Sequence, residues 1–263
     1  MEKFKLDGRV ILLTGAAGYL GKSIAKHLAA SGAEVILSGR SKERLDSLAA
    51  DIGAGGRAHV LKMDITNEAS RQDGIDFIQQ KFGRLNGLIN NAYSGKVGSL
   101  DAITAQDFSL ACENTLIGPF SLIQKAIPLL EMSGKNNIGG VIVNIASMYG
   151  AVSPDPKIYG DSGANNPVHY GAAKAGLIQM TRYLACHLAS KGIRANSISP
   201  GPFPRQEASG APSEFIRKLR DKVPMGRIGE PDEIAGPVVF LLSDAASYIT
   251  GANLPVDGGW TAW

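Results

Sequence analysis

Apolar residues follow two alternating patterns along the chain. Short runs rich in β-branched residues, such as Val10–Leu13, are followed by longer amphipathic segments, such as Tyr19–Ala30. A continuous apolar run predicts a strand that is buried on both faces, and helical crossovers between such strands make a sheet parallel. The alternation therefore predicts an α/β protein with a three-layer, doubly wound (Rossmann) fold and a mainly parallel seven-stranded sheet.

The same pattern predicts where each strand and helix begins and ends. No linker or internal repeat divides the elements, so residues 1–263 are expected to form a single domain. The predicted strands cover Val10–Leu13, Glu34–Leu37, His59–Met63, Gly87–Asn90, Val141–Ile145, Ile193–Ile198 and Asn253–Val256. The predicted helices cover Tyr19–Ala30, Lys42–Asp51, Asn67–Phe82, Ala105–Leu130, Tyr170–Ser190 and Asp232–Leu242, with a short helical piece at Ser213–Asp221.

Composition narrows the class of protein. The net charge is +3 and the basic residues are scattered, so no nucleic-acid or membrane partner is expected. Cys112 and Cys186 match no metal-ligand spacing, and we interpret them as buried thiols in a reducing compartment. The N-terminus lacks a signal-peptide apolar region, and no apolar run reaches the ~18 residues of a membrane span. A cytoplasmic protein that binds a small molecule, without a metal, is the expectation.

A glycine-rich turn, Thr14–Gly21, joins the first predicted strand to the first predicted helix. Gly15, Gly18 and Gly21 would let the backbone approach a pyrophosphate, whose charge would be met by the free amides of the helix N-terminus. A tight connection without a ligand is the alternative. The position of the turn at the start of a βαβ series favours nucleotide binding.

The end of the second strand bears on the choice of cofactor. An acidic side chain at this point accepts a hydrogen bond from the ribose 2′-hydroxyl of NAD, and Leu37–Ser41 contains none. Gly39 and Arg40 offer space and a guanidinium for a 2′-phosphate instead. NADP(H) is therefore the preferred cofactor, with NAD(H) as the second candidate. Arg40 could also be a solvated residue at a helix start, or stack on adenine.

Polar residues also follow the third and fourth strands. Asp64 would lie beside the adenine edge of a nucleotide, or it could cap the next helix, with Thr66 or Asn67 competing for that role. Asn90 and Asn91 lie where the carboxyl edge of the sheet meets a ligand crevice. They could contact a ligand there, or only satisfy backbone groups.

Tyr170 and Lys174 stand four residues apart in a predicted helix, which places both side chains on one face. A neighbouring ammonium favours the phenolate and lowers the pKa of a tyrosine from its usual value of ~10. Ser147, at the end of a buried strand, supplies a hydroxyl that could hold a substrate oxygen. By itself the Tyr/Lys pair also fits a solvated helix face, so the surrounding motifs decide its meaning.

Together these segments resemble the short-chain dehydrogenase/reductase family, of the compact single-domain type, over nearly the whole chain. The resemblance implies an NAD(P)(H)-dependent oxidoreductase that interconverts a secondary alcohol and a ketone by hydride transfer. The motifs that carry it are Thr14–Gly21, Asn90–Ala92, Ser147, Tyr170 with Lys174, Pro200-Gly201, Thr250-Gly251 and Val256–Gly259.

The resemblance also implies roles for individual residues. Tyr170 is the expected general acid/base, Lys174 is expected to lower its pKa and hold the nicotinamide ribose, and Ser147 is expected to position the substrate oxygen. Asn114 is the expected fourth member of the catalytic network. The expected cofactor contacts are Gly15, Gly18, Tyr19, Leu20, Gly21, Arg40, Asp64, Ile65, Asn91, Tyr170, Lys174 and Pro200.

Three departures from the family pattern are local. The turn Thr14–Gly21 reads Gly-x-x-Gly-x-x-Gly, as in the extended branch of the family, whereas compact members read Gly-x-x-x-Gly-x-Gly. Tyr93 stands where a glycine usually follows Asn90–Ala92. The network asparagine is expected at Thr115, so Asn114 is one residue early unless a helix bulge restores its position.

The fourth departure is an insertion. Ser147 and Tyr170 are 23 residues apart (170 − 147), which is longer than usual in the family. The extra residues, within 151–167, form either a surface elaboration or a wall of the substrate site. Their polar side chains suit a polyhydroxylated or phosphorylated substrate better than a steroid or long acyl chain. The polar residues in and beside the insertion are Lys157, Tyr159, Asp161, Asn165, Asn166 and His169.

The insertion and Asn166–Tyr170 are similar to family members associated with bacterial surface-sugar (nonulosonic acid) biosynthesis. Residues 202–227 correspond to the lid that covers the substrate in this family, and Arg205 could meet a phosphate or carboxylate there, or stay solvated. A sugar or sugar derivative is the expected substrate, with a 3-oxoacyl-thioester as the alternative. A non-enzymatic nucleotide sensor or scaffold is another alternative. The family also implies a homo-oligomer, either a dimer or a tetramer.

Overall fold

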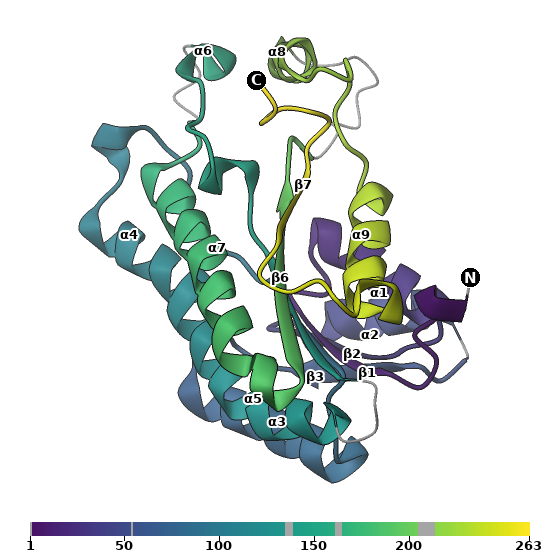
Figure 1. The fold of residues 1–263 in the computed structure, drawn as a ribbon. Helices are drawn as coiled ribbons and strands as arrows, with labels where there is room; N and C mark the ends of the chain where they lie inside the picture. Colours follow the sequence, from purple (N-terminus) through teal and green to yellow (C-terminus); the bar gives the residue numbers. More distant parts are fainter. Residues whose placement is uncertain (1, 54, 135–138, 161–164, 205–213) are drawn as a thin grey trace.

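The fold was analysed in a computed structural model, which describes residues 2–53, 55–134, 139–160, 165–204 and 214–263. Its strands form one seven-stranded sheet in the order β3-β2-β1-β4-β5-β6-β7, with every neighbouring pair parallel (Figure 1). The predicted doubly wound α/β fold is confirmed. The strands are β1 (Val10–Thr14), β2 (Glu34–Gly39), β3 (Ala58–Lys62), β4 (Gly87–Asn90), β5 (Gly140–Ile145), β6 (Ile193–Pro200) and β7 (Asn253–Val256).

Helices cover both faces of the sheet. One face carries α1 (Tyr19–Ala30), α2 (Lys42–Ile52) and α9 (Asp232–Leu242), as Figure 1 shows. The other face carries α3 (Glu68–Phe82), α4 (Ala105–Cys112), α5 (Gly118–Gly134) and α7 (Val168–Leu188). Two short helices, α6 (Pro156–Tyr159) and α8 (Glu214–Lys222), stand beyond the carboxyl ends of the strands. The short 3-10 helices cover Glu2–Phe4, Leu100–Ala102, Met148–Gly150, Ala189–Lys191 and Asp244–Ala246.

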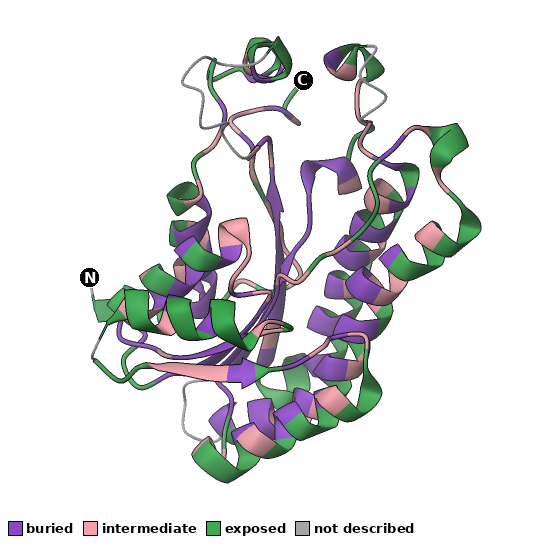
Figure 2. Ribbon diagram, turned by 180° about the vertical axis from the view of Figure 1, so that it is seen from behind, coloured by how far each residue is buried: buried purple, intermediate pink, exposed green. Residues whose placement is uncertain are grey.

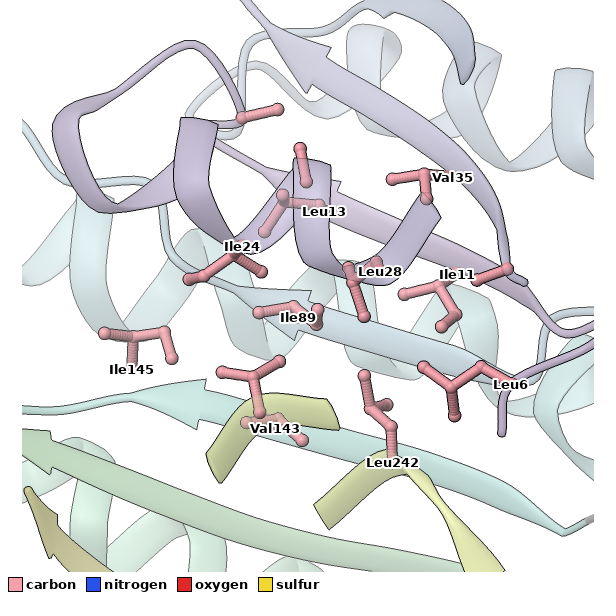
Figure 3. Packing of buried hydrophobic residues seen from close by; sticks show 14 of the residues in the cluster. Leu6, Ile11, Leu13, Ile24, Leu28, Val35, Ile89, Val143, Ile145 and Leu242 are labelled. Atoms are coloured by element: carbon pink, nitrogen blue, oxygen red, sulfur yellow. The ribbon is translucent and has the colours of Figure 1, made fainter. Parts of the chain in front are cut away.

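The core lies on both sides of the central strands. Every residue of β1 is buried; Ile11 and Leu13 pack toward α1, while Leu12 faces the opposite layer. Figure 3 shows Leu13 close to Ile24 and Leu28 of α1. Figure 2 shows buried residues along the strands and exposed residues on the outer helix surfaces. This two-sided burial is the physical reason that the strands read as continuous apolar runs.

A chain of buried polar side chains joins β4, β5 and α7 near the carboxyl edge of the sheet. Asn90 Nδ2 donates to Asn144 Oδ1 at 2.8 Å, and Asn144 Nδ2 donates to Thr181 Oγ1 at 2.8 Å. The Thr181 hydroxyl donates in turn to the Leu177 carbonyl at 2.7 Å. Because buried polar groups are costly when unpaired, these hydrogen bonds fix the position of α7 against the sheet.

The structure corrects two predictions. The predicted helix Ala105–Leu130 is two α-helices joined by a π-helix over Glu113–Ile117, where each turn holds an additional residue. The predicted burial of both thiols is wrong, because Cys186 lies on the outer face of α7 and is exposed, and Cys112 is partly exposed. In the part of the chain that the structure describes, no helix is long and apolar enough to span a membrane.

Candidate active site

A cleft of about 550 Å³ opens at the carboxyl ends of β1, β2 and β4. The glycine turn forms its floor. A Cβ on Gly15 would lie 2.8 Å from Ala92 Cα, and a Cβ on Gly21 would overlap the Gly15 carbonyl oxygen, so only glycine allows this close packing. Helix α1 has Gly18 as its N-cap and no capping side chain, which leaves backbone amides available to an anion. These features fit a nucleotide pyrophosphate.

Most of the predicted cofactor contacts lie around this cleft. Asp64, Arg40 and Asn91 line it from three different strand ends. Three predicted contacts, Pro200, Tyr170 and Lys174, are not part of its lining. The lining also includes Thr14, Gly15, Gly18, Tyr19, Leu20, Gly21, Ser38, Gly39, Ser41, Arg44, Ile65, Tyr93, Ser94 and Asn114.

Two basic side chains lie at the adenosine end expected from the turn. Arg40 is exposed and lines the cleft directly after β2. Arg44 extends from the first turn of α2, and its Nη2 donates to the Ala17 carbonyl at 2.8 Å. Sequence reasoning missed Arg44. Arg44 lies in the first turn of α2, three residues after the N-cap Ser41, and a side chain there can reach back to the glycine turn. This position in the sequence could have identified Arg44 as a candidate.

Asp64 and Asn91 line the cleft and also make hydrogen bonds within the protein. Asp64 Oδ1 accepts hydrogen bonds from Thr66 N at 2.9 Å and Thr66 Oγ1 at 2.8 Å, while Asn67 caps α3. Burial acts to raise the pKa of the Asp64 carboxyl, but the Thr66 hydrogen bonds and the Arg40 charge outweigh it and lower the pKa. Asn91 Nδ2 donates to the Thr14 and Gly15 carbonyls at 3.0 and 3.1 Å, so this side chain braces the glycine turn.

Three residues predicted to be catalytic come together beside the cleft. Ser147 follows β5, and its side chain hydrogen-bonds to the Tyr170 side chain on α7. Lys174 lies one turn further along α7, where its Nζ donates to the Ile145 carbonyl at 2.6 Å and lies 5.7 Å from the centre of the Tyr170 ring. Two hydroxyls and an ammonium group therefore converge at one point on the sheet edge.

Burial dominates the electrostatics of this group. Burial raises the pKa of Tyr170, although the Ser147 hydrogen bond opposes the increase. Burial lowers the pKa of Lys174 to about 8. The expected lowering of the Tyr170 pKa is therefore wrong. The physical reason is that desolvation of the phenolate exceeds the attraction of an ammonium that is directed at the Ile145 carbonyl.

Asn114 lies within the π-helix, as the helix-bulge alternative required. Its Nδ2 donates to the Leu110 carbonyl at 2.7 Å, and its Oδ1 accepts from Ser94 Oγ at 3.2 Å. Asn114 lines the nucleotide cleft, whereas Thr115 does not. The additional residue in the turn rotates the asparagine toward the cleft despite its offset in sequence.

A second cavity, of about 340 Å³, adjoins Ser147 and Tyr170. The insertion contributes Tyr159, Asn165 and Asn166 to its wall. Aromatic and apolar groups make up more of the lining than the polar sequence of the insertion indicated. The remaining lining residues are Val97, Met148, Tyr149, Gly201, Pro202, Phe203, Pro204, Phe215 and Leu219.

The insertion packs against α8. Asp155 forms an ion pair with Lys222, the Tyr159 and Phe215 rings lie 5.7 Å apart, and the Tyr149 and Tyr159 hydroxyls are 3.3 Å apart. A small apolar cluster that includes Ile158, Ile216 and Leu219 joins the two segments. The insertion and α8 thus form one cap over the catalytic group, a contact that sequence reasoning did not anticipate.

Several predicted polar contacts do not reach this cavity. His169 is fully buried, and neither of its ring nitrogens has a hydrogen-bond partner among the described residues. Lys157 is exposed on α6 and does not line the cavity. Asp161 and Arg205 lie outside the described residues. Within the described ranges, no group of three or more His, Cys, Asp or Glu residues could hold a metal ion.

The chain is similar in sequence to known proteins. Residues 15–261 match the family described as Enoyl-(Acyl carrier protein) reductase. The chain is 34% identical to D-threitol dehydrogenase of Mycolicibacterium smegmatis over 263 residues, which covers 98% of this chain and 95% of that protein.

Two solved structures share the fold along nearly their entire length. The Pseudomonas aeruginosa RhlG/NADP active-site complex has a TM-score of 0.89 and 29% identity, with 99% of each chain covered. The 3-ketoacyl-(acyl-carrier-protein) reductase from Brucella melitensis complexed with NADH has a TM-score of 0.84 and 30% identity, with 98% of this chain and 100% of that chain covered. With its glycine-lined cleft and its Ser147, Tyr170 and Lys174 group, the chain belongs to the short-chain dehydrogenase/reductase family, whose members are NAD(P)-dependent oxidoreductases that act on CH–OH groups.

Proposed function

We propose that this enzyme interconverts a secondary alcohol and a ketone on a sugar or sugar derivative, with Tyr170 as the general acid/base. The observation that carries the proposal is the interacting Ser147 and Tyr170 pair, which lies on the wall of a cavity beside the nucleotide cleft. A bound nicotinamide supplies or accepts the hydride. The protein holds the reacting oxygen and moves its proton.

The proton moves between the substrate oxygen and the Tyr170 phenol. In reduction, the phenol gives its proton to the oxygen of the reacting carbonyl, which becomes a hydroxyl, and Ser147 donates a hydrogen bond to the same oxygen. The phenolate that remains is stabilised by the Lys174 ammonium, because an opposite charge nearby favours the ionised form. Asn114 holds its carboxamide in the adjoining cleft, where it can order a water that returns a proton.

The cavity wall supports a substrate with several hydroxyl groups. Asn165 and Asn166 supply carboxamides, and the Tyr159 hydroxyl adds a further polar group beside the reacting pair. The flat Tyr159 and Phe215 rings suit the apolar face of a sugar ring. The polyol named for the threitol dehydrogenase relative, and the similarity of Asn166–Tyr170 to enzymes of bacterial nonulosonic acid pathways, support the same substrate class.

A 3-oxoacyl-thioester is the second candidate, and one observation favours it. The cavity is lined by Val97, Met148, Phe203 and Leu219, which suit an acyl chain. The Brucella melitensis relative bears the name of this activity. A nucleotide sensor or scaffold is the third candidate, and the complete Ser147, Tyr170 and Lys174 group argues against it.

NADP(H) is the proposed cofactor, because the cleft after β2 presents Arg40 and no acidic residue from Ser38 to Ser41. Arg40→Asp should lower kcat/KM with NADPH by roughly 10- to 100-fold and leave kcat/KM with NADH equal or higher, since one charge-assisted contact contributes about 1.5–3 kcal/mol. Arg44→Gln is a matched variant on the neighbouring turn, and a smaller loss is expected because Arg44 is occupied by the Ala17 carbonyl. Higher wild-type efficiency with NADH would overturn this proposal.

The decisive experiment is a turnover screen over polyols, amino sugars, sugar phosphates and 3-oxoacyl-thioesters with both cofactors. Tyr170→Phe keeps the ring but removes the acid/base, and a loss of at least ~100-fold in kcat is expected. Turnover of acyl-thioesters alone would establish the second candidate. Full biological activity of Tyr170→Phe would establish the non-enzymatic one.

A homo-oligomer, either a dimer or a tetramer, is the proposed assembly. The outer faces of the long helices expose apolar side chains, including Leu110, Ile117, Phe120 and Tyr183. Burial of such a face stabilises association. Sedimentation of Phe120→Lys as a monomer, with the wild type as a larger species, would support this assembly, and a monomeric wild type would refute it.

A further inference from the structure

Tyr93 packs directly against the catalytic tyrosine. Its ring lies edge-on to the Tyr170 ring, with centroids 5.0 Å apart and an interplanar angle of 77°. The Lys174 ammonium lies 5.7 Å from the centre of each ring. A tyrosine at this position takes the place where the family pattern has a glycine, so the contact is a feature of this chain and not of the shared catalytic group.

The segment after β4 is shaped to hold this side chain. Tyr93 lines the nucleotide cleft, while Tyr170 lines the substrate cavity, so the ring pair separates the two spaces. A Cβ on Gly95 would overlap the Tyr93 hydroxyl, which means that glycine at this position makes room for the phenol. Ser94, which lies between Tyr93 and Gly95, donates a hydrogen bond from its Oγ to Asn114 Oδ1 at 3.2 Å and connects the segment to the π-helix.

We propose that Tyr93 is a positioning residue that holds the Tyr170 ring in place and keeps water away from its phenol. The inference rests on the proposed role of Tyr170 as the acid/base. An edge-to-face pair restricts the ring to one orientation, and orientation of the reacting group contributes directly to rate. The ring also covers a side of Tyr170 that would otherwise face the open nucleotide cleft.

Tyr93 is suited to this role because it does not compete for the proton. Burial, with a smaller contribution from Tyr170, raises the pKa of Tyr93 to about 12, so the Tyr93 phenol stays neutral at pH values near 7. Removal of the ring should admit water to Tyr170 and lower the Tyr170 pKa. In alcohol oxidation the phenolate is the active form, so the rising limb of the pH–rate profile should move to lower pH.

Two substitutions separate the ring from its hydroxyl. Tyr93→Phe keeps the ring contact, and we expect kcat within about twofold of wild type with an unchanged pH profile. Tyr93→Gly removes the contact, and a fall in kcat of roughly 2- to 10-fold is expected, because such ring pairs contribute about 0.5–1.5 kcal/mol. The control is Tyr248→Ala, which removes a fully exposed tyrosine that contributes to neither the cleft nor the substrate cavity, with no expected effect on kcat or the profile.

A titration that needs no substrate completes the test. With ¹³Cζ-labelled tyrosine, the Tyr170 resonance is assigned by its absence in Tyr170→Phe, and its titration is compared between wild type and Tyr93→Gly. Earlier titration in Tyr93→Gly, together with the shifted rate profile, supports the proposal. An unchanged Tyr170 titration, or a Tyr93→Phe variant as impaired as Tyr93→Gly, would overturn it. If no alcohol or ketone is turned over, the proposed function fails, while the titration still decides the role of Tyr93.

Discussion

Replacement of Lys174 by methionine should make the protein more stable while it removes activity. Lys174 is 4% exposed, and burial lowers its pKa from the usual 10.5 to about 8. A difference of ~2.5 pKa units corresponds to ~3.4 kcal/mol of destabilisation when the lysine is charged, at about 1.36 kcal/mol per unit. Loss of the charge-assisted hydrogen bond to the Ile145 carbonyl offsets about 1.5–3 kcal/mol. A net stabilisation of ~0.5–2 kcal/mol at pH 7 is expected.

The stabilisation should depend on pH with a definite sign. Because the folded pKa of Lys174 lies below the unfolded one, wild-type stability falls as pH drops from about 10.5 to about 8, and the full penalty applies below that window. At pH 9 the penalty is ~2 kcal/mol, so the advantage of Lys174→Met should shrink by ~1.3 kcal/mol between pH 7 and pH 9.

Urea unfolding at the two pH values measures both quantities, provided that the m-value is unchanged. Lys22→Met, at an exposed position on α1, is the matched control and should change stability by no more than about 0.5 kcal/mol at either pH. A Lys174→Met variant that is less stable than wild type at pH 7, or whose advantage is the same at both pH values, would refute the claim that burial of the ammonium is costly. The loss of turnover should accompany the gain in stability, as expected where a strained site is kept for function.

Three further outcomes follow from other parts of the structure. Gly21→Ala places a Cβ against the Gly15 carbonyl and should weaken nucleotide binding by about 10-fold or more in a fluorescence titration, while Gly236→Ala, which meets no neighbouring atom, should not. Asn144→Leu leaves the buried Asn90 Nδ2 unpaired and removes the donor to Thr181, so it should lower the free energy of unfolding by about 1–3 kcal/mol in urea. A loss below about 0.5 kcal/mol would contradict the stabilising role of these buried hydrogen bonds. Asp155→Asn keeps the N-cap of α6 but removes the charge that faces Lys222, so the KM for substrate should rise about 2- to 5-fold at low salt and less at high salt, with the free energy of unfolding hardly changed. If KM responds neither to this substitution nor to salt, the contact between the insertion and α8 does not contribute to substrate binding.

Sequence reasoning succeeded where the signal lies within one element or one strand end. The buried strands, the glycine turn and the Tyr170/Lys174 spacing are all local, and the structure has the expected strands in the expected order along the chain. The offset of Asn114 was also readable, because a helix shifts its side chains by about 100° for each additional residue, and the structure contains the π-helix that this offset required.

Contacts between segments far apart in sequence were not readable in this way. The contact of Tyr93 with Tyr170 and the ion pair between Asp155 and Lys222 each depend on how separate elements pack. The exposed Cys186 was missed for the same reason, since helical periodicity alone does not say which neighbours cover a face.

By itself, then, the sequence determined the doubly wound sheet, the glycine turn that forms the floor of the cleft, and the positions of the Ser147, Tyr170 and Lys174 groups, because these follow from spacing along the chain. Only the tertiary structure decided that the insertion and α8 form a single cap, that aromatic and apolar residues make up most of the cavity lining beneath it, and that the pKa of Tyr170 is raised. The physical reason is that cavity shape and desolvation are set by all the segments that surround a group, and a pKa responds to that collective burial as strongly as to any one neighbouring charge.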